Sequence, residues 1–201
     1  SKNKIYQLKV ALAQGLRIPQ TLVTTSFEDA REFIKEHQDV LVKPMSVPFM
    51  EYDDGRIEIM YSKRLRKEDV THLSFVKYTP TLFQVYVKKA FELRVTVVGE
   101  RVFACKIDSQ RSERAKEDWR RYDFANVPHT QFPLPVSVER QCVLLLRQLG
   151  LRFGAIDMIV TPEGEYFFLE INPNGQWLWI QELTKLPIAE AIADELCLAC
   201  D

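Results

Sequence analysis

Three oxygen-bearing side chains beyond residue 155 are the first sign of chemistry in this sequence. Asp157 lies in one apolar run, and Glu170 and Asn172 lie in a second run that follows the turn signal Pro162-Glu163-Gly164. A four-residue turn over 162–165 predicts that Asp157 faces Glu170 across a hairpin, with the Cβ atoms roughly 5 Å apart. Asn172 is two residues beyond Glu170, so strand periodicity puts its side chain on the same face.

Two facing carboxylates among apolar neighbours need a compensating charge. Oxygen donors without His or Cys favour a hard cation, and Mg²⁺ bound partly through phosphate oxygens fits best. The alternative is a half-exposed pair of carboxylates that arginine side chains from elsewhere in the chain neutralise.

Basic side chains provide candidate anion contacts. Lys43 ends the apolar run 40–42 and precedes Pro44, so either an anion meets its ammonium group or the side chain reaches solvent. Several arginines surround Asp118-Trp119-Arg120; guanidinium groups suit phosphate, and nearby acids make a solvated surface an equal alternative. Asn172-Pro173-Asn174-Gly175 is either part of a site or only a tight turn. Together these features predict a pocket for a metal nucleotide, although no P-loop or G-x-G-x-x-G motif occurs.

Alternating patterns and turn signals predict the elements that position these residues. Helices are expected over 4–15, 27–37 and 138–149 and from 187 onward, and a loop over 45–55. Strands are expected over 40–43, 56–61, 82–87, 93–98, 101–107, 155–160 and 166–171, and residues 108–135 read as irregular. Antiparallel hairpins with helices between them indicate an α+β fold.

Composition excludes several classes of protein. The 201 residues carry 27 Lys or Arg and 28 Asp or Glu, so the net charge is -1, which argues against duplex nucleic acid as a partner. The hydrophobic share of 46% argues against intrinsic disorder. No apolar run approaches the roughly 20 residues of a membrane span. We therefore expect a cytoplasmic protein with reduced thiols, in which Cys197-x-x-Cys200 lies at the end of a helix.

The order of the motifs resembles that of ATP-grasp ligases over nearly the whole chain, and among them most the graspetide (microviridin-type) peptide maturases. The motifs are Lys4, Gly15-Leu16-Arg17-Ile18-Pro19, Leu41-Val42-Lys43-Pro44, Phe83-Gln84-Val85-Tyr86-Val87-Lys88, Glu92-Leu93-Arg94-Val95, Ser109-Gln110, Asp118-Trp119-Arg120, Gly154-Ala155-Ile156-Asp157 and Leu169-Glu170-Ile171-Asn172-Pro173-Asn174-Gly175-Gln176-Trp177.

This resemblance implies an ATP-grasp fold with two lobes, each with an antiparallel sheet and helices, and the nucleotide in the cleft between them. We expect a smaller N-terminal lobe over 1–82, including the first helix, and a C-terminal lobe with the metal site over 83–201. ATP-grasp proteins usually begin with a further α/β domain, so we expect this chain to be a piece of a longer ligase. The loop 45–55 is poor in glycine for a phosphate-covering loop, which puts turnover by this piece alone in question.

The resemblance also implies the roles of individual residues. Lys4 and Lys43 contact the nucleotide phosphates, and Lys43 also reaches the adenine. Gln84, Tyr86 and Val87 form a hinge beside the adenine, the last two through backbone groups, and Glu92 binds the ribose hydroxyls. Arg120 is the catalytic residue, which meets the terminal phosphate and the developing acyl phosphate. Asp157, Glu170 and Asn172 hold Mg²⁺, expected as two ions.

The implied reaction joins a carboxylate to a hydroxyl or an amine at the expense of ATP. In graspetide maturation the carboxylate is a side chain of a precursor peptide, and the product is an ester or amide macrocycle. The expected partner is therefore a precursor peptide, with a homodimer as the candidate assembly. Two alternatives stay open: a glutamate-type ligase that adds amino acids to a protein or small acid, and a nucleotide- or peptide-binding module without catalysis.

Overall fold

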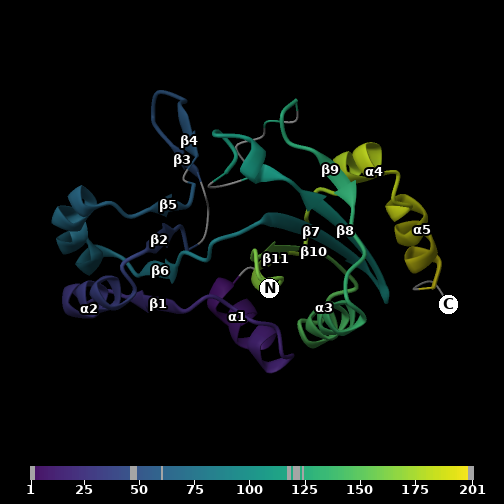
Figure 1. The fold of residues 1–201 in the computed structure, drawn as a ribbon, viewed down its shortest axis with the longest axis horizontal. Helices are drawn as coiled ribbons and strands as arrows, with labels where there is room; N and C mark the ends of the chain where they lie inside the picture. Colours follow the sequence, from purple (N-terminus) through teal and green to yellow (C-terminus); the bar gives the residue numbers. More distant parts are fainter. Residues whose placement is uncertain are drawn as a thin grey trace. The chain divides into compact units, whose positions relative to one another are not determined.

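Two antiparallel sheets organise the chain into two units, which Figure 1 shows as a ribbon. The structure is a computed structural model that describes residues 3–45, 49–59, 61–116, 119, 123 and 125–198. Ser1–Ile18 and Lys88–Asp201 make up one unit, called the large unit below, and Pro19–Val87 makes up the small unit.

The large unit is built on a five-stranded sheet in the order β11-β10-β7-β8-β9. Its elements are α1 (Lys4–Ala13), β7 (Phe91–Val98), β8 (Arg101–Ile107), η2 (Ser109–Arg111), β9 (His129–Gln131), α3 (Val136–Gln148), β10 (Phe153–Val160), β11 (Tyr166–Asn172), α4 (Leu178–Thr184) and α5 (Ile188–Leu198).

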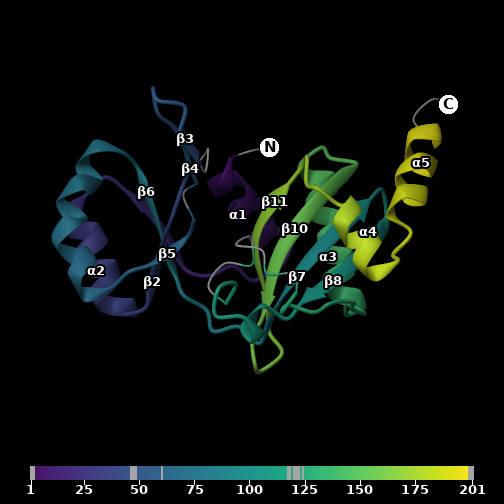
Figure 2. The ribbon, with the colours of Figure 1, turned by 90° about the horizontal axis from the view of Figure 1, so that it is seen from above.

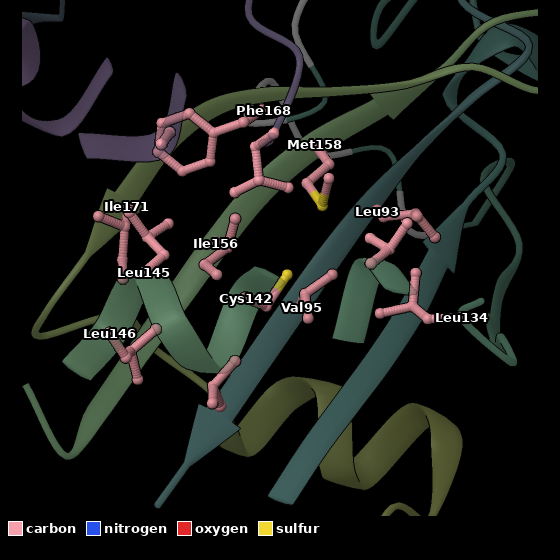
Figure 3. Packing of buried hydrophobic residues seen from close by; sticks show 14 of the residues in the cluster. Leu93, Val95, Leu134, Cys142, Leu145, Leu146, Ile156, Met158, Phe168 and Ile171 are labelled. Carbon is pink, nitrogen blue, oxygen red and sulfur yellow. The ribbon is translucent and has the colours of Figure 1, made fainter. Parts of the chain in front are cut away.

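The two faces of this sheet have different coverings. On one face, alternate residues such as Val95 of β7 and Ile156 of β10 pack against α1 and α3, for example against Leu145 (Figure 3). α1 also lies beside β11 (Figure 2). On the other face, Phe103, Cys105 and Ile107 of β8 belong to a second hydrophobic cluster with Ile188 of α5. That second face also carries buried polar and charged side chains of β7 and β10, among them Arg94, Thr96 and Asp157, and the candidate site is built there.

The small unit has its own sheet, in the order β1-β6-β2-β5, and its own core. Ser26 begins α2 by accepting a hydrogen bond of 3.1 Å from the backbone N–H of Asp29, as an N-cap residue does. Ala30 of α2 packs with Val40 and Phe83 of the sheet. Its elements are β1 (Thr21–Thr24), α2 (Phe27–His37), β2 (Val40–Lys43), β3 (Phe49–Glu51), β4 (Ile57–Ile59), β5 (Lys63–Arg64), η1 (Lys67–Tyr78) and β6 (Thr81–Val85).

The predicted α+β class is confirmed, and so are most of the predicted elements. The loop expected over 45–55 is wrong in part, because β3 and β4 pair as a separate two-stranded sheet. The segment 108–135 contains η2 and β9, and α4 is a helix that the pattern did not predict. Residues 1–18 group with the C-terminal sheet and Pro19–Val87 forms a unit of its own, whereas the expected lobes 1–82 and 83–201 stay a prediction.

Candidate metal and nucleotide site

Asp157 and Glu170 lie directly opposite each other in the β10–β11 hairpin, which confirms the predicted pairing. The route to that pairing differs from the prediction. The turn is one residue longer than assumed, so that Val160 faces Tyr166. A bulge at Leu169 takes up the extra residue and brings Glu170 back opposite Asp157. The bulge therefore decides which face of the sheet the second carboxylate occupies.

Arg94 neutralises Asp157 inside the sheet. The register of β7 against β10 places Arg94 opposite Asp157, and Arg94 Nη1 donates a hydrogen bond of 2.8 Å to Asp157 Oδ1. The two side chains are only 7% and 9% exposed. Arg94 Cζ lies 5.7 Å from the centroid of the Trp119 ring, within the range of a cation–π contact. Sequence reasoning assigned no role to Arg94, although a charged residue inside a buried strand is a usable signal.

Lys4 reaches the second carboxylate. Lys4 Nζ lies 3.3 Å from Glu170 Oε2, and the side chains are 19% and 25% exposed. α1 holds Lys4 there because Gln7 is fixed to β11 by two hydrogen bonds: its Nε2 donates to Ile171 O, and its Oε1 accepts from Ile171 N. Lys4 was expected at the nucleotide phosphates. The structure places it beside a candidate metal ligand.

Asn172 opens a tight turn that follows β11. It pairs with Ala155 of β10 and so lies two positions from Glu170 along the strand. Its Oδ1 accepts a hydrogen bond of 2.9 Å from Asn174 N, and its backbone oxygen accepts one of 3.1 Å from Gly175 N. A side-chain carbonyl oxygen has two lone pairs, so this turn leaves Asn172 Oδ1 able to bind a second group.

The donor set fits Mg²⁺ in chemistry. Asp157, Glu170 and Asn172 offer only oxygen atoms, and the register gathers them on adjacent strands. Within the described residues no group of three or more His, Cys, Asp and Glu side chains is arranged to hold a metal, and the expected set contains two carboxylates and one amide. Both carboxylates have cationic partners in the chain, which agrees only in part with the alternative: Asp157 pairs with an arginine but is buried, and Glu170 pairs with a lysine.

Glu92 lies on the same face of β7 as Arg94, two residues earlier. It forms a buried ion pair with Lys89, and the side chains of Lys89 and Glu92 are 6% and 4% exposed. Glu92 was expected at the ribose. Lys89 was not singled out from the sequence, although Lys88-Lys89 just before a buried strand is a visible signal.

Gln84 is a buried amide in the middle of the small unit. β6 places it between Thr21 of β1 and Leu41 of β2. Gln84 Nε2 donates a hydrogen bond of 2.9 Å to Thr21 Oγ1, whereas its Oε1 has no hydrogen-bond partner among the described residues. A buried acceptor without a donor costs free energy, so this oxygen is suited to an N–H group of a ligand.

The other expected nucleotide contacts also lie in the small unit. Lys43 ends β2, pairs with Leu82 and is half-buried. The backbone N–H of Tyr86 donates to Asp39 O, and the ring of Tyr86 stacks with the guanidinium of Arg64. Val87 follows β6 as the last residue of the unit and is half-buried. Their nucleotide roles stay predictions.

The expected catalytic residue, Arg120, lies outside the described residues, and so does Asp118. Trp119 between them is described. The centroid of its ring lies 5.5 Å from that of Trp179, and His129 meets Trp179 edge-on at 5.5 Å. Burial lowers the pKa of His129 from its ordinary value, against smaller raising effects from a backbone hydrogen bond and Asp108.

In the part of the chain that the structure describes, no helix has the length and apolar character needed to cross a bilayer.

Comparisons with known proteins bear on what this arrangement does. The chain matches the RimK-like ATP-grasp domain over residues 1–196. Among solved structures it is similar to a Chryseobacterium gregarium RiPP-associated ATP-grasp ligase in complex with ADP and a leader and core peptide. The two are 40% identical with a TM-score of 0.89, and the match covers 98% of this chain and 59% of that ligase. It is also similar to the macrocyclase MdnC bound with precursor peptide MdnA from Microcystis aeruginosa MRC, with 36% identity and a TM-score of 0.86 over 98% of this chain and 62% of that one.

Curated relatives are more distant. N-acetylaspartylglutamate synthase A of Mus musculus is 25% identical over 195 residues, which is 96% of this chain and 50% of the relative. Human beta-citrylglutamate synthase B is 24% identical over 197 residues, 96% of this chain and 49% of the relative. The chain thus spans about half the length of these relatives. Its match to the domain over nearly all its residues, with an antiparallel sheet in each unit, establishes that the chain belongs to the RimK-like ATP-grasp family.

Proposed function

We propose that this chain is the nucleotide- and metal-binding part of an ATP-dependent ligase that activates a side-chain carboxylate of a peptide and couples it to a hydroxyl or an amine. The product is an ester or amide macrocycle in a ribosomally made peptide. ADP and phosphate are the other products, and the cytoplasm is the compartment in which we place the reaction.

The observation that carries this proposal is the register of the β10–β11 hairpin. It sets Asp157 opposite Glu170 with Asn172 two residues on, so the oxygen donors that we assign to Mg²⁺ lie on adjacent strands. Support for a peptide substrate comes from the similarity to two ligases whose structures contain precursor peptides or their parts, at 40% and 36% identity.

The nucleotide contacts are assigned to the residues that the family resemblance implies. Gln84 Oε1, a buried acceptor without a donor among the described residues, suits the exocyclic amino group of adenine. The backbone of Tyr86 and Val87 borders the base, and Lys43 contacts the base and the phosphates. Glu92 serves the ribose, and Lys4 serves the phosphates once it leaves Glu170. In this proposal Pro19–Val87 is the smaller lobe of the fold, and the large unit is the other lobe.

Asp157, Glu170 and Asn172 are the residues that would hold Mg²⁺, as two ions. When bound, Mg²⁺ neutralises charge on the phosphate oxygens and favours transfer of the terminal phosphoryl group.

The chain's own task is alignment and charge neutralisation rather than covalent catalysis. A carboxylate oxygen of the peptide attacks the γ-phosphorus of ATP, the bond to the bridging oxygen breaks, and an acyl phosphate and ADP form. The hydroxyl or amine then attacks the acyl carbon, phosphate leaves with the bonding electrons, and the attacking group loses its proton. We assign to Arg120 the role of stabilising the negative charge that develops on the transferred phosphoryl group.

Calorimetry of ADP binding tests the metal and nucleotide assignment. We expect Glu170→Ala to weaken ADP binding in the presence of Mg²⁺ by at least about tenfold, because a metal ligand is lost. Glu163→Ala is the matched control, since Glu163 is an exposed carboxylate in the turn of the same hairpin. Equal affinities of the Glu170 variant and the wild type would contradict the metal assignment.

The similarity to N-acetylaspartylglutamate synthase A favours a second candidate, an amino-acid ligase. The full-length protein, incubated with ATP and a candidate precursor peptide, separates the two by the mass of the product. Loss of one water per bond supports cyclisation, whereas gain of an amino-acid residue mass on a protein or small acid supports the second candidate. ADP binding without either product would identify a non-catalytic binding module.

A further inference from the structure

We propose that Arg94 is a positioning residue, which holds Asp157 and the turn from Asn172 to Gly175 in the relative geometry that the metal site needs. This inference rests on the proposed function, because it assumes that Asp157 and Asn172 bind the same Mg²⁺. It concerns a side chain that the predicted set of site residues does not include.

The first observation is the fixed attachment of Arg94 to Asp157. Their hydrogen bond is 2.8 Å long, and both side chains are buried in the sheet. A guanidinium group is planar and remains charged, so it can hold a carboxylate in one orientation while its Cζ lies over the Trp119 ring, 5.7 Å from the centroid. Asp157 is thereby held in one orientation before any metal arrives.

The second observation is the close approach of Gly175 to the same guanidinium. A Cβ atom at residue 175 would lie 2.8 Å from Arg94 Nη2 and 2.3 Å from the Cβ of Ala155. Gly175 does not have a positive φ, so its backbone conformation does not demand glycine. Lack of space is the reason for the glycine: the turn that begins at Asn172 lies close against both Ala155 and Arg94.

One guanidinium therefore contacts both segments that carry candidate ligands. Its Nη1 bonds to Asp157 on β10, and its Nη2 lies against the turn that begins with Asn172. Mg²⁺ demands near-ideal octahedral geometry, so a small relative shift of these segments weakens binding. The ion pair of Lys4 is less fixed than that of Arg94, because its contact with Glu170 is 3.3 Å long and more exposed to solvent. Lys4 can therefore move from Glu170 to another anion.

The test compares ADP affinity with Mg²⁺ and with EDTA, measured by calorimetry on the 201-residue chain. We expect Arg94→Lys, which keeps the charge but loses the planar fork, to reduce the Mg²⁺-dependent gain in affinity by about 10- to 100-fold. The affinity in EDTA should change less than about twofold, because the base and ribose contacts are elsewhere. Thr96→Val is the matched control: Thr96 is buried two residues further along β7, and its hydroxyl has no hydrogen-bond partner among the described residues.

Gly175→Ala gives a second test that leaves every charge in place. The added methyl group must displace the turn from Arg94 and Ala155, so we expect a similar loss of the Mg²⁺-dependent gain. The double variant Arg94→Lys with Gly175→Ala should lose little more than either single variant, since both changes break one arrangement. If Arg94→Lys does not fold, as shown by circular dichroism, the Gly175 variant decides the question.

The outcomes separate this inference from the proposed function. An unchanged Mg²⁺-dependent gain in Arg94→Lys or in a folded Gly175→Ala variant overturns the positioning role alone. An equal loss of affinity with Mg²⁺ and with EDTA also overturns it, because Arg94 would then contact the nucleotide directly. A wild-type chain that binds ADP equally well with and without Mg²⁺ contradicts the metal site itself, and with it this inference.

Discussion

Cys105 and Cys142 are buried thiols, whereas Cys197 is exposed. Burial raises the pKa of both buried thiols to about 12. At about pH 8 only about one buried thiol in ten thousand is then ionised, and the thiolate is the reactive form.

We therefore expect N-ethylmaleimide at about pH 8 to label Cys197 in the folded chain and to leave Cys105 and Cys142 unmodified. The check is peptide mass mapping after labelling, with a guanidinium-unfolded sample as the control in which Cys105 and Cys142 also react. Labelling of Cys142 in the folded chain at the rate of Cys197 would contradict the buried environment.

His129 is a second residue whose surroundings determine its charge. Burial lowers its pKa below the ordinary value of 6.5. As pH falls below that value, the unfolded chain takes up a proton that the folded chain does not, so the free energy of unfolding decreases.

Replacement of His129 by Gln removes this difference in proton uptake. We expect the urea midpoint of the variant to fall less than that of the wild type when pH is lowered from about 7.5 to about 5.5. Equal falls in the two proteins would show that His129 is protonated in the folded chain.

At the scale of elements, the bulge in β11 and the covering by α3 decide which side chains enter the core. Phe168 is fully buried and packs in the main cluster of the large unit, as Figure 3 shows. Phe167, the preceding residue on the same strand, points to the other face and is half-buried.

Phe168→Ala should lower the free energy of unfolding by about 3–5 kcal/mol, because it leaves a cavity in a packed core. Phe167→Ala removes the same atoms from a half-exposed site, and we expect a loss of about 1 kcal/mol. Urea unfolding followed by circular dichroism gives both values. Equal losses at the two positions would argue against the register of β11.

Local signals account for the elements that sequence reasoning predicted well. Ser26 marks the start of α2, and Gly99-Glu100 forms the two-residue turn between β7 and β8. The features that could not be predicted from the sequence are those that depend on contacts between residues far apart in the chain. The partners Arg94 and Asp157 are 63 positions apart, so their ion pair can be predicted only when the register of β7 against β10 is known. The bulge at Leu169 could not be predicted either, because no residue pattern in β11 marks it.

At the scale of the whole molecule, each unit has a core of its own. Val40 and Phe83 belong to the cluster of the small unit, and Phe168 and Leu145 belong to that of the large unit. The grouping of residues 1–18 with the large unit depends on long-range contacts, such as the hydrogen bond between Gln7 and Ile171, which local sequence patterns do not reveal.

Phe83→Ala, at a site that is 1% exposed, should therefore loosen Pro19–Val87 more than the β10–β11 hairpin. Amide hydrogen exchange measured by mass spectrometry can localise the effect, and we expect faster exchange in β6 and β2. Phe168→Ala serves as the reciprocal control, with its main effect in β10 and β11. A uniform increase over both units would mean that they open together.

The attachment of α1 to β11 through Gln7 and Ile171 has a consequence for synthesis of the chain. The two residues are 164 positions apart, so a ribosome adding about 5–20 residues per second takes roughly 10–30 seconds to make the partner of the first helix. During that interval Pro19–Val87 can already fold. The apolar side of α1, which includes Leu8 and Ala11, stays exposed because the strands that cover it have not yet been made. The small unit is thus an insertion that a growing chain completes before the unit into which it is inserted.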